Sequence, residues 1–176
     1  MPIEAAQNVH QHAAEQKKRA AGIYKPTLFN PHEYKTVARL AELIIPADEV
    51  SGSALEAGAP EFIDVIANHN TDLANRLIGG LAWLDRRMEI SHGKPFLLCT
   101  PEQQMAMLDV IAYRKNATDS GAIGVRFFDW MRRLTADAFY TSPIGIKDVG
   151  YLGNKGMTVF QVPVAAIDYA VKKSGL

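Results

Sequence analysis

Two helix starts that contain proline constrain the fold most strongly. Residues 30–33 read Asn-Pro-His-Glu, and residues 100–103 read Thr-Pro-Glu-Gln. In each, the first side chain can cap free backbone N–H groups, and proline occupies the first helical position, where its missing N–H is not needed. The fourth residue can close a capping box by bonding back to the cap. The two patterns therefore predict helices that begin at Pro31 and Pro101.

Apolar residues recur at helical spacing over most of the chain. The pattern predicts helices over residues 31–45, 60–70, 71–88, 101–115, 122–138 and, briefly, 163–173. Gly79 and Gly80 weaken the third of these and allow a close helix crossing. Alternation typical of strands is almost absent. We therefore predict an all-α fold, an irregular bundle of about five to six helices.

The chain is long enough for one domain with a hydrophobic core. Residues 1–27 carry an alanine- and lysine-rich stretch, and we expect a flexible arm or one that becomes ordered on a partner. Residues 28–176 are expected to form a single helical domain that includes an extended segment over residues 139–162.

This segment differs from the helices around it. Pro143, Gly145, Gly150, Gly153 and Gly156 interrupt any helical period, yet the residues between them are too apolar for a solvated linker. We predict an ordered, extended segment without regular helix over residues 139–154, packed on its own helices or on another protein. Aromatic residues are enriched in the cores of interfaces. The predicted partner-interface residues are Phe139, Tyr140, Ile144, Ile146, Val149, Tyr151, Leu152 and Asn154.

The overall charge excludes some classes of partner. Nineteen basic and nineteen acidic side chains cancel, so no global field favours nucleic acid or an anionic membrane. No run approaches the roughly 18 apolar residues that span a bilayer. The basic triplet at residues 17–19 lacks the apolar core of a signal peptide after it, so no export signal is expected here.

Redox cofactors lack their usual motifs. A dinucleotide fold needs a Gly-x-Gly-x-x-Gly turn between strand and helix, and the spacing of Gly150, Gly153 and Gly156 does not match it. Haem attachment and iron–sulfur clusters need several cysteines, and Cys99 is alone. We therefore expect no cofactor in this chain.

We assign no catalytic residue and no metal site. His10 and His12 lack a third ligand and are expected to be solvated, His32 lies in a first helical turn, and His69 and His92 lie at loop positions. The acidic stretch with Asp48, Glu49 and Glu56 lacks the alternating ligands of a calcium loop. The Cys99 thiol and the aromatic residues at 127–130 are interpreted as packed core.

Three stretches carry a resemblance to a known family. Residues 42–48 read ELIIPAD, residues 127–131 read FFDWM, and residues 141–154 contain the patterns Thr-Ser-x-x-Gly-Ile and Gly-Tyr-x-Gly-Asn. Together they resemble the gluconate 2-dehydrogenase subunit 3 family over residues 29–163. The last pattern is most similar to the glucoside 3-dehydrogenase branch.

The resemblance implies a small, cofactor-free subunit of a bacterial FAD-dependent sugar or polyol dehydrogenase. The implied partner is the FAD-containing catalytic subunit of the GMC type, with a cytochrome c as electron acceptor through that subunit. The chain would support folding, stability or export of its partner and would be accessory rather than an enzyme by itself. The implied location is the periplasm if a twin-arginine signal was removed or a partner carries it, and otherwise the cytoplasm.

Two other classes remain open from the residues themselves. One is a stand-alone helical enzyme or ligand-binding protein whose site is built from scattered residues. An autonomous enzyme should show a sizeable pocket, whereas an orphaned subunit should expose an apolar patch. The other is a general chaperone for exported proteins, without one dedicated partner.

Overall fold

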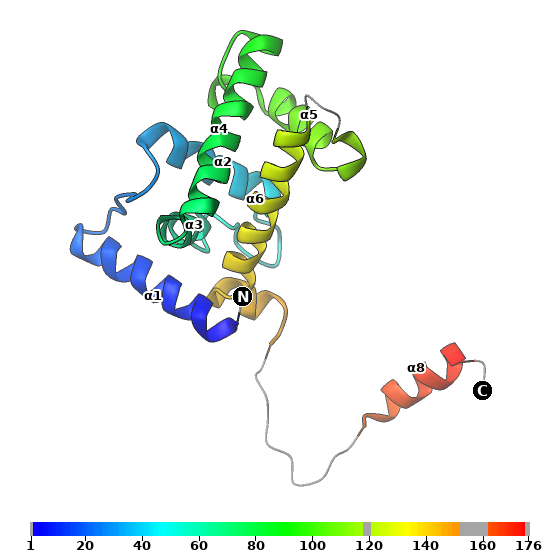
Figure 1. Ribbon diagram of the computed structural model, residues 1–176. Coiled ribbons are helices and arrows are strands. Elements are labelled where there is room, and N and C mark those ends of the chain that lie inside the picture. Colours follow the sequence, from blue (N-terminus) through cyan, green and yellow to red (C-terminus); the bar gives the residue numbers. More distant parts are fainter. Residues whose placement is uncertain (1, 118–120, 152–161, 175–176) are drawn as a thin grey trace.

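The computed structural model describes residues 2–117, 121–151 and 162–174. Within these ranges every regular element is helical, which confirms the all-α prediction (Figure 1). The α-helices are α1 (Ile3–Arg19), α2 (Pro31–Ile44), α3 (Ala59–Asn68), α4 (Thr71–His92), α5 (Pro101–Ile111), α6 (Ala122–Tyr140), α7 (Pro143–Asp148) and α8 (Val164–Ser174). Two single-turn 3-10 helices, η1 (Phe96–Leu98) and η2 (Arg114–Asn116), flank α5.

Both predicted capping boxes are present. The Asn30 side chain accepts hydrogen bonds from the backbone N–H groups of His32 and Glu33, each at 2.9 Å, and the Glu33 carboxylate accepts from the Asn30 N–H. Thr100 and Gln103 exchange the equivalent pair of bonds at 3.3 and 3.0 Å. These bonds satisfy N–H groups that a helix start leaves free, so α2 and α5 begin where the sequence predicts.

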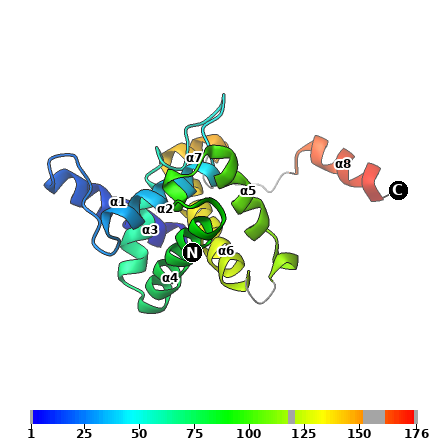
Figure 2. The ribbon, with the colours of Figure 1, turned by 90° about the horizontal axis from the view of Figure 1, so that it is seen from above.

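Helix α6 is the central element. It packs against α2, α3, α4, α5 and α7, and Figure 2 shows it running beside α4 and α5. Phe127, Phe128, Met131 and Leu134 are buried in the main core, as predicted. The prediction that Trp130 belongs to this core is wrong, because its side chain is 37% exposed on the outer face of α6.

The crossing of α4 and α6 depends on glycine. A Cβ atom at Gly80 would collide with the Phe127 ring, and one at Gly124 would collide with the Trp83 ring. By contrast, a Cβ atom at Gly79 would meet nothing within 4 Å. The predicted close helix crossing is therefore confirmed, and Gly80 is the residue of the pair that permits it.

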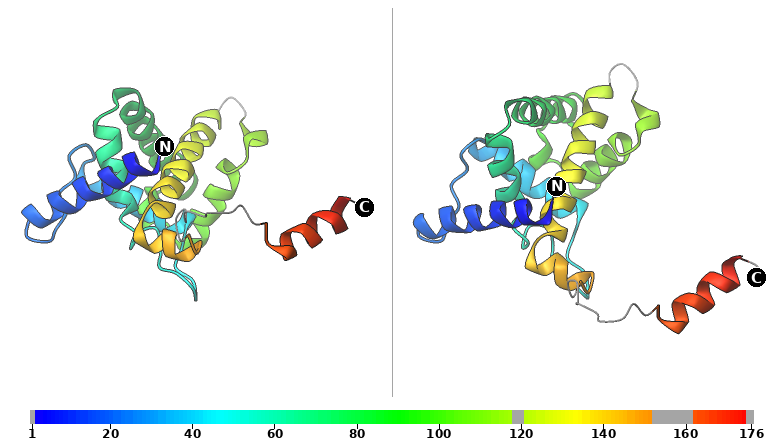
Figure 3. Two further views of the ribbon diagram at one scale, coloured as in Figure 1. Left: turned by 90° about the horizontal axis from the view of Figure 1, so that it is seen from below. Right: turned by 60° about the horizontal axis from the view of Figure 1, so that its bottom comes forward.

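The amino-terminal segment differs from the expected flexible arm. Residues 3–19 form α1, which packs across α3 and reaches the carboxyl end of α6 (Figure 3). Ala6 and Ala13 are buried at these contacts. Small side chains on one face of α1 allow the close packing, which composition alone did not reveal.

A buried carboxylate fastens the chain between α1 and α2 to α3. The Asp64 side chain accepts hydrogen bonds from the Tyr24 hydroxyl at 2.9 Å, from the Thr27 N–H and hydroxyl at 2.8 and 2.9 Å, and from the N–H groups of Leu28 and Phe29 at 3.1 Å. A carboxylate that leaves water needs such donors. This one side chain therefore accepts five hydrogen bonds from the loop.

The prediction of an extended segment without helix is wrong for residues 139–148. Phe139 and Tyr140 complete α6, and two residues separate its end from the start of α7. The Ser142 hydroxyl caps α7 by accepting from the Gly145 N–H at 3.1 Å, and Pro143 occupies its first position. Proline therefore starts a helix here rather than breaking one. Gly150, with φ of +64°, follows the end of α7.

Helix α8 confirms the predicted short final helix. No residue of α8 is buried, and it lies apart from the bundle in Figures 1 and 3. Among the described helices, none combines the length and the apolar character that crossing a bilayer requires.

Candidate partner interface

The predicted interface residues divide into four groups in the structure, of which the buried Phe139 is one. Tyr140, Val149 and Tyr151 are exposed, at 47%, 57% and 52% of their surfaces, whereas Ile144 and Ile146 are half-buried. Leu152 and Asn154 lie outside the described residues. The exposed members surround α7 and the carboxyl end of α6, so they are available to a partner.

Phe139 requires a correction. Its side chain is 1% exposed and packs with Ala41, Phe62 and Ala138 in a second apolar cluster of the bundle. A ring buried in this way cannot also contact a partner in the folded chain. Consecutive residues of a helix point in different directions. The sequence analysis expected no helix here and therefore did not separate Phe139 from Tyr140.

The turn from α6 to α7 positions the exposed aromatic residues. The Thr141 hydroxyl donates to the Asp137 carbonyl at 2.6 Å, and the Ser142 hydroxyl donates to the Phe139 carbonyl at 2.7 Å. Ile144 packs against the second cluster and anchors α7 to the bundle. The Thr-Ser-x-x-Gly-Ile pattern therefore builds the scaffold beneath the candidate interface.

His10 is another correction. It was expected to be solvated, but its ring lies 4.8 Å from that of Phe62, and its Nε2 atom is 3.0 Å from the Ala138 carbonyl oxygen and 3.1 Å from the Thr141 hydroxyl. Burial lowers the pKa of His10, and the hydrogen bond to Ala138 opposes that shift. His10 therefore links α1 to the turn that carries the candidate interface.

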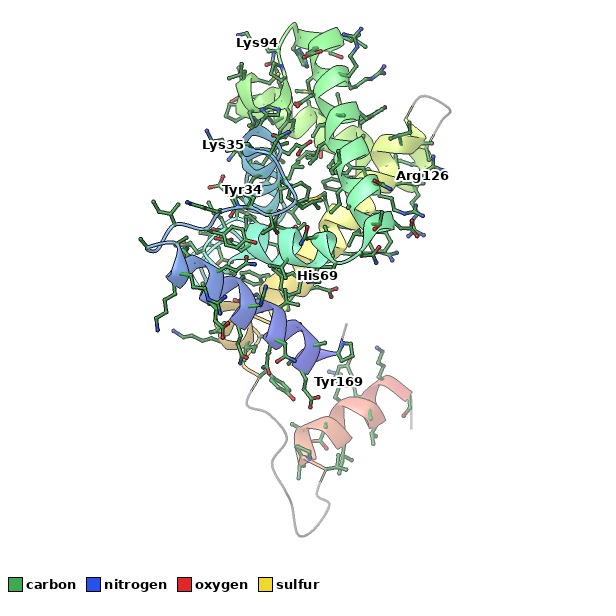
Figure 4. The ribbon with its side chains drawn as sticks, turned by 60° about the vertical axis from the view of Figure 1, so that its left-hand side comes forward. Tyr34, Lys35, His69, Lys94, Arg126 and Tyr169 are labelled. Carbon is green, nitrogen blue, oxygen red and sulfur yellow. The ribbon has the colours of Figure 1, made fainter. Side chains whose placement is uncertain are left out.

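The other histidines form no metal-binding cluster within the described part of the chain. His32 contacts the Asp85 carboxylate across α2 and α4, and the His69 Nδ1 atom lies 2.8 Å from the Val65 carbonyl oxygen at the end of α3 (Figure 4). His12 lies edge-on to His69 with ring centres 6.4 Å apart. No group of three potential ligands occurs among the residues described.

Cys99 and the acidic loop have structural roles. The Cys99 thiol is buried, as predicted, and burial raises its pKa. The Asp48 carboxylate accepts hydrogen bonds from the N–H groups of Ser51 and Val50, which lower its pKa. The Glu56 carboxylate similarly accepts from the Ser53 N–H at 2.7 Å. These carboxylates close turns in the loop between α2 and α3.

Comparison with known proteins identifies the family. The sequence profile of gluconate 2-dehydrogenase subunit 3 matches residues 31–158, well over half of the chain. The chain belongs to the gluconate 2-dehydrogenase subunit 3 family. No curated protein and no solved structure matched the chain significantly.

Membership in this family indicates a small subunit of a dehydrogenase complex. The matched region begins at α2, includes α7, and extends into the undescribed residues after Tyr151. All predicted interface residues therefore lie in the family region, whereas α1 and α8 lie outside it.

Proposed function

We propose that this chain is the non-catalytic small subunit of a bacterial FAD-dependent sugar dehydrogenase of the glucoside or gluconate type. It binds the FAD-containing catalytic subunit, which is of the GMC class, and supports the folding, stability or export of that subunit. The observation that carries the proposal is the family match over residues 31–158. Within that region, the exposed Tyr140 at the end of α6 and the exposed Tyr151 after α7 offer a suitable contact surface.

The physical mechanism is linkage between binding and folding. A subunit that binds the folded flavoprotein but not the unfolded one stabilises it by RT ln(1 + [L]/Kd). This amounts to about 2.7 kcal/mol when the free small subunit is at 100 times Kd. FAD and the redox chemistry belong to the catalytic subunit, from which a cytochrome c accepts electrons. The complex functions in the periplasm if the export signal lies on a removed leader or on the partner, and otherwise in the cytoplasm.

Co-expression tests this function directly. The chain, produced with the flavoprotein subunit from its native host, should co-purify as a complex with a flavin absorbance spectrum. The flavoprotein should melt at a higher temperature with the chain than without it. The chain purified alone should carry neither flavin nor metal.

Two results would reject the proposal. Stoichiometric FAD in the isolated chain would favour a stand-alone enzyme or ligand-binding protein. Binding to many unrelated unfolded proteins, with no preference for the flavoprotein, would favour a general chaperone.

A further inference from the structure

The outer face of α6 carries a continuous row of side chains that lie outside the buried core. Its residues recur at steps of three and four, which places them on one face of the helix. Asp137 is half-buried and the other members are exposed. The row consists of Ile123, Arg126, Trp130, Arg133, Asp137 and Tyr140. Tryptophan, tyrosine and arginine are the residue types most enriched at the energetic centres of interfaces.

A groove runs beside this row, between α6 and α4. Arg76 and Gly79 line it from α4, and Ile123, Arg126 and Trp130 line it from α6, around a volume of about 280 Å³. Gly79 leaves one wall without a side chain, and the Phe127 ring packed on Gly80 forms part of the lining. The groove thus combines an apolar floor with an exposed indole ring and two guanidinium groups.

The charges at this groove are unbalanced within the described residues. No carboxylate there lies within 4.0 Å of the Arg76 or Arg126 guanidinium group. Asp72 lies one helical turn before Arg76 but forms no such ion pair. Figure 4 shows Arg126 on the outer side of the α4 and α6 pair.

The carboxylate of α6 that follows Arg126 by three residues already pairs with other arginines. Asp129 forms ion pairs with Arg114, Arg132 and Arg133 at 3.4, 3.0 and 3.2 Å. Three arginines therefore share this one carboxylate.

We propose that the groove between α4 and α6 receives an acidic segment of the catalytic subunit. A carboxylate of that segment lies between Arg76 and Arg126, and an apolar side chain lies against Trp130 and Ile123. Arginine binds carboxylates through paired, charge-assisted hydrogen bonds, which explains why the occupant is acidic rather than merely apolar. This inference rests on the function proposed above and names where and how the partner binds.

Continuity with the candidate interface supports a single partner. The row from Ile123 to Tyr140 is about 26 Å long at 1.5 Å per residue, and Tyr140 belongs to both surfaces. A stable complex buries about 800 Å² on each protein. The α6 row extends that turn into a surface of suitable length.

Neutralising the two arginines tests the proposal. The variant Arg76→Gln/Arg126→Gln is compared with the control Arg19→Gln/Arg86→Gln, which removes the same charge from exposed sites on α1 and α4. We expect the groove variant to bind the flavoprotein subunit at least tenfold more weakly, with a smaller dependence of Kd on salt. The control should change Kd by less than about twofold. Circular dichroism melts of both variants should match the wild type.

A photo-crosslink identifies the occupant. With p-benzoylphenylalanine in place of Trp130, illumination of the complex should join this position to a peptide of the flavoprotein that contains Asp or Glu. Crosslinks to a second copy of this chain or to residues 152–161 of the same chain would overturn the proposal. Crosslinks to a flavoprotein peptide without acidic residues would do so as well.

These measurements distinguish failure of the proposed function from failure of the proposed groove. If the wild-type chain does not bind the flavoprotein at all, both the proposed function and this inference fail. If the wild type binds and the groove and control variants bind equally well, only the groove is rejected. A groove variant that melts early is replaced by Trp130→Ala, for which the same loss of binding without loss of stability is required.

Discussion

The backbone carbonyl of Phe139 lies directly against Gly145, so closely that a Cβ atom on Gly145 would collide with it. The Ser142 hydroxyl bridges the same two residues, because it donates to the Phe139 carbonyl and accepts from the Gly145 N–H. The end of α6 and the start of α7 thus share one contact. The glycine of the Thr-Ser-x-x-Gly-Ile pattern is required by packing rather than by an extended backbone.

Gly145→Ala should therefore destabilise the turn between α6 and α7. Overpacking of this kind typically costs about 1–3 kcal/mol of unfolding free energy. Urea denaturation of the isolated chain measures the loss, and partner binding should weaken with it. A Gly145→Ala variant as stable as the wild type would contradict the close contact.

Alanine substitutions at the two adjacent glycines of α4 should change the unfolding free energy in opposite directions. Gly79→Ala places its Cβ in open space and should raise the unfolding free energy by up to about 1 kcal/mol through helix propensity. Gly80→Ala collides with the Phe127 ring and should lower it by about 1–3 kcal/mol. Thermal melts measure both variants, and each serves as the control for the other. If both melting temperatures shifted in the same direction, the proposed helix crossing would be refuted.

Substitution of Asp64 should lower the unfolding free energy far more than substitution of any one of its hydrogen-bond donors. Asp64→Ala leaves the Tyr24 and Thr27 hydroxyls and three backbone N–H groups without their acceptor, and we expect the unfolding free energy to fall by about 3 kcal/mol or more. Tyr24→Phe removes one hydrogen bond and should cost about 1 kcal/mol. Urea unfolding compares the two, and equal losses would show that Asp64 does not organise this loop.

His10 should make the chain less stable in mild acid. Its folded-state pKa is lowered from 6.5 by burial, so the unfolded chain takes up a proton at a higher pH than the folded one. The stability that the neutral ring contributes is therefore complete above about pH 6.5 and is lost progressively below it. Lys17, Glu56 and Glu61 line the same cavity as His10 and are unchanged in the two proteins compared.

Denaturation of the wild type and of His10→Gln between pH 7 and pH 5 measures this effect. The wild type should lose more stability over that range than the variant does. Parallel pH profiles would show that His10 is protonated equally in the folded and unfolded chains.

Substitutions at Phe139 and at Tyr151 should have separate effects, the first on folding and the second on partner binding. Phe139→Asp places an unpaired charge in the core and should abolish cooperative folding, because burial of such a charge costs several kcal/mol. Tyr151→Asp alters an exposed side chain and should change stability by less than about 0.5 kcal/mol, yet lower complex yield at least tenfold.

Tyr113→Asp is the control for this pair, since Tyr113 is similarly exposed but lies beside α5. Circular dichroism and co-purification with the flavoprotein are measured on the same samples. A Tyr151 variant that binds as well as the Tyr113 control would remove Tyr151 from the interface.

The helices were largely predictable because their signals are local. The capping residues Asn30 and Thr100 act within their own first turn, and apolar spacing marks the buried face of each helix. The helix α7 was missed although Ser142-Pro143 is also a cap followed by proline at the first helical position. Its glycines were interpreted as helix breakers, whereas Gly145 is needed for close packing on Phe139.

By itself, the sequence determined the helical class and the starts of α2 and α5, since these depend on residues close together in the chain, and three short motifs carried the family resemblance. Only the tertiary structure decided which aromatic residues face inward. It buried Phe139, exposed Trp130, placed His10 within hydrogen-bond distance of Thr141 and placed Arg76 and Arg126 along the same groove. Those outcomes depend on how separate helices pack, and a contact between distant segments leaves no periodic signal in either one.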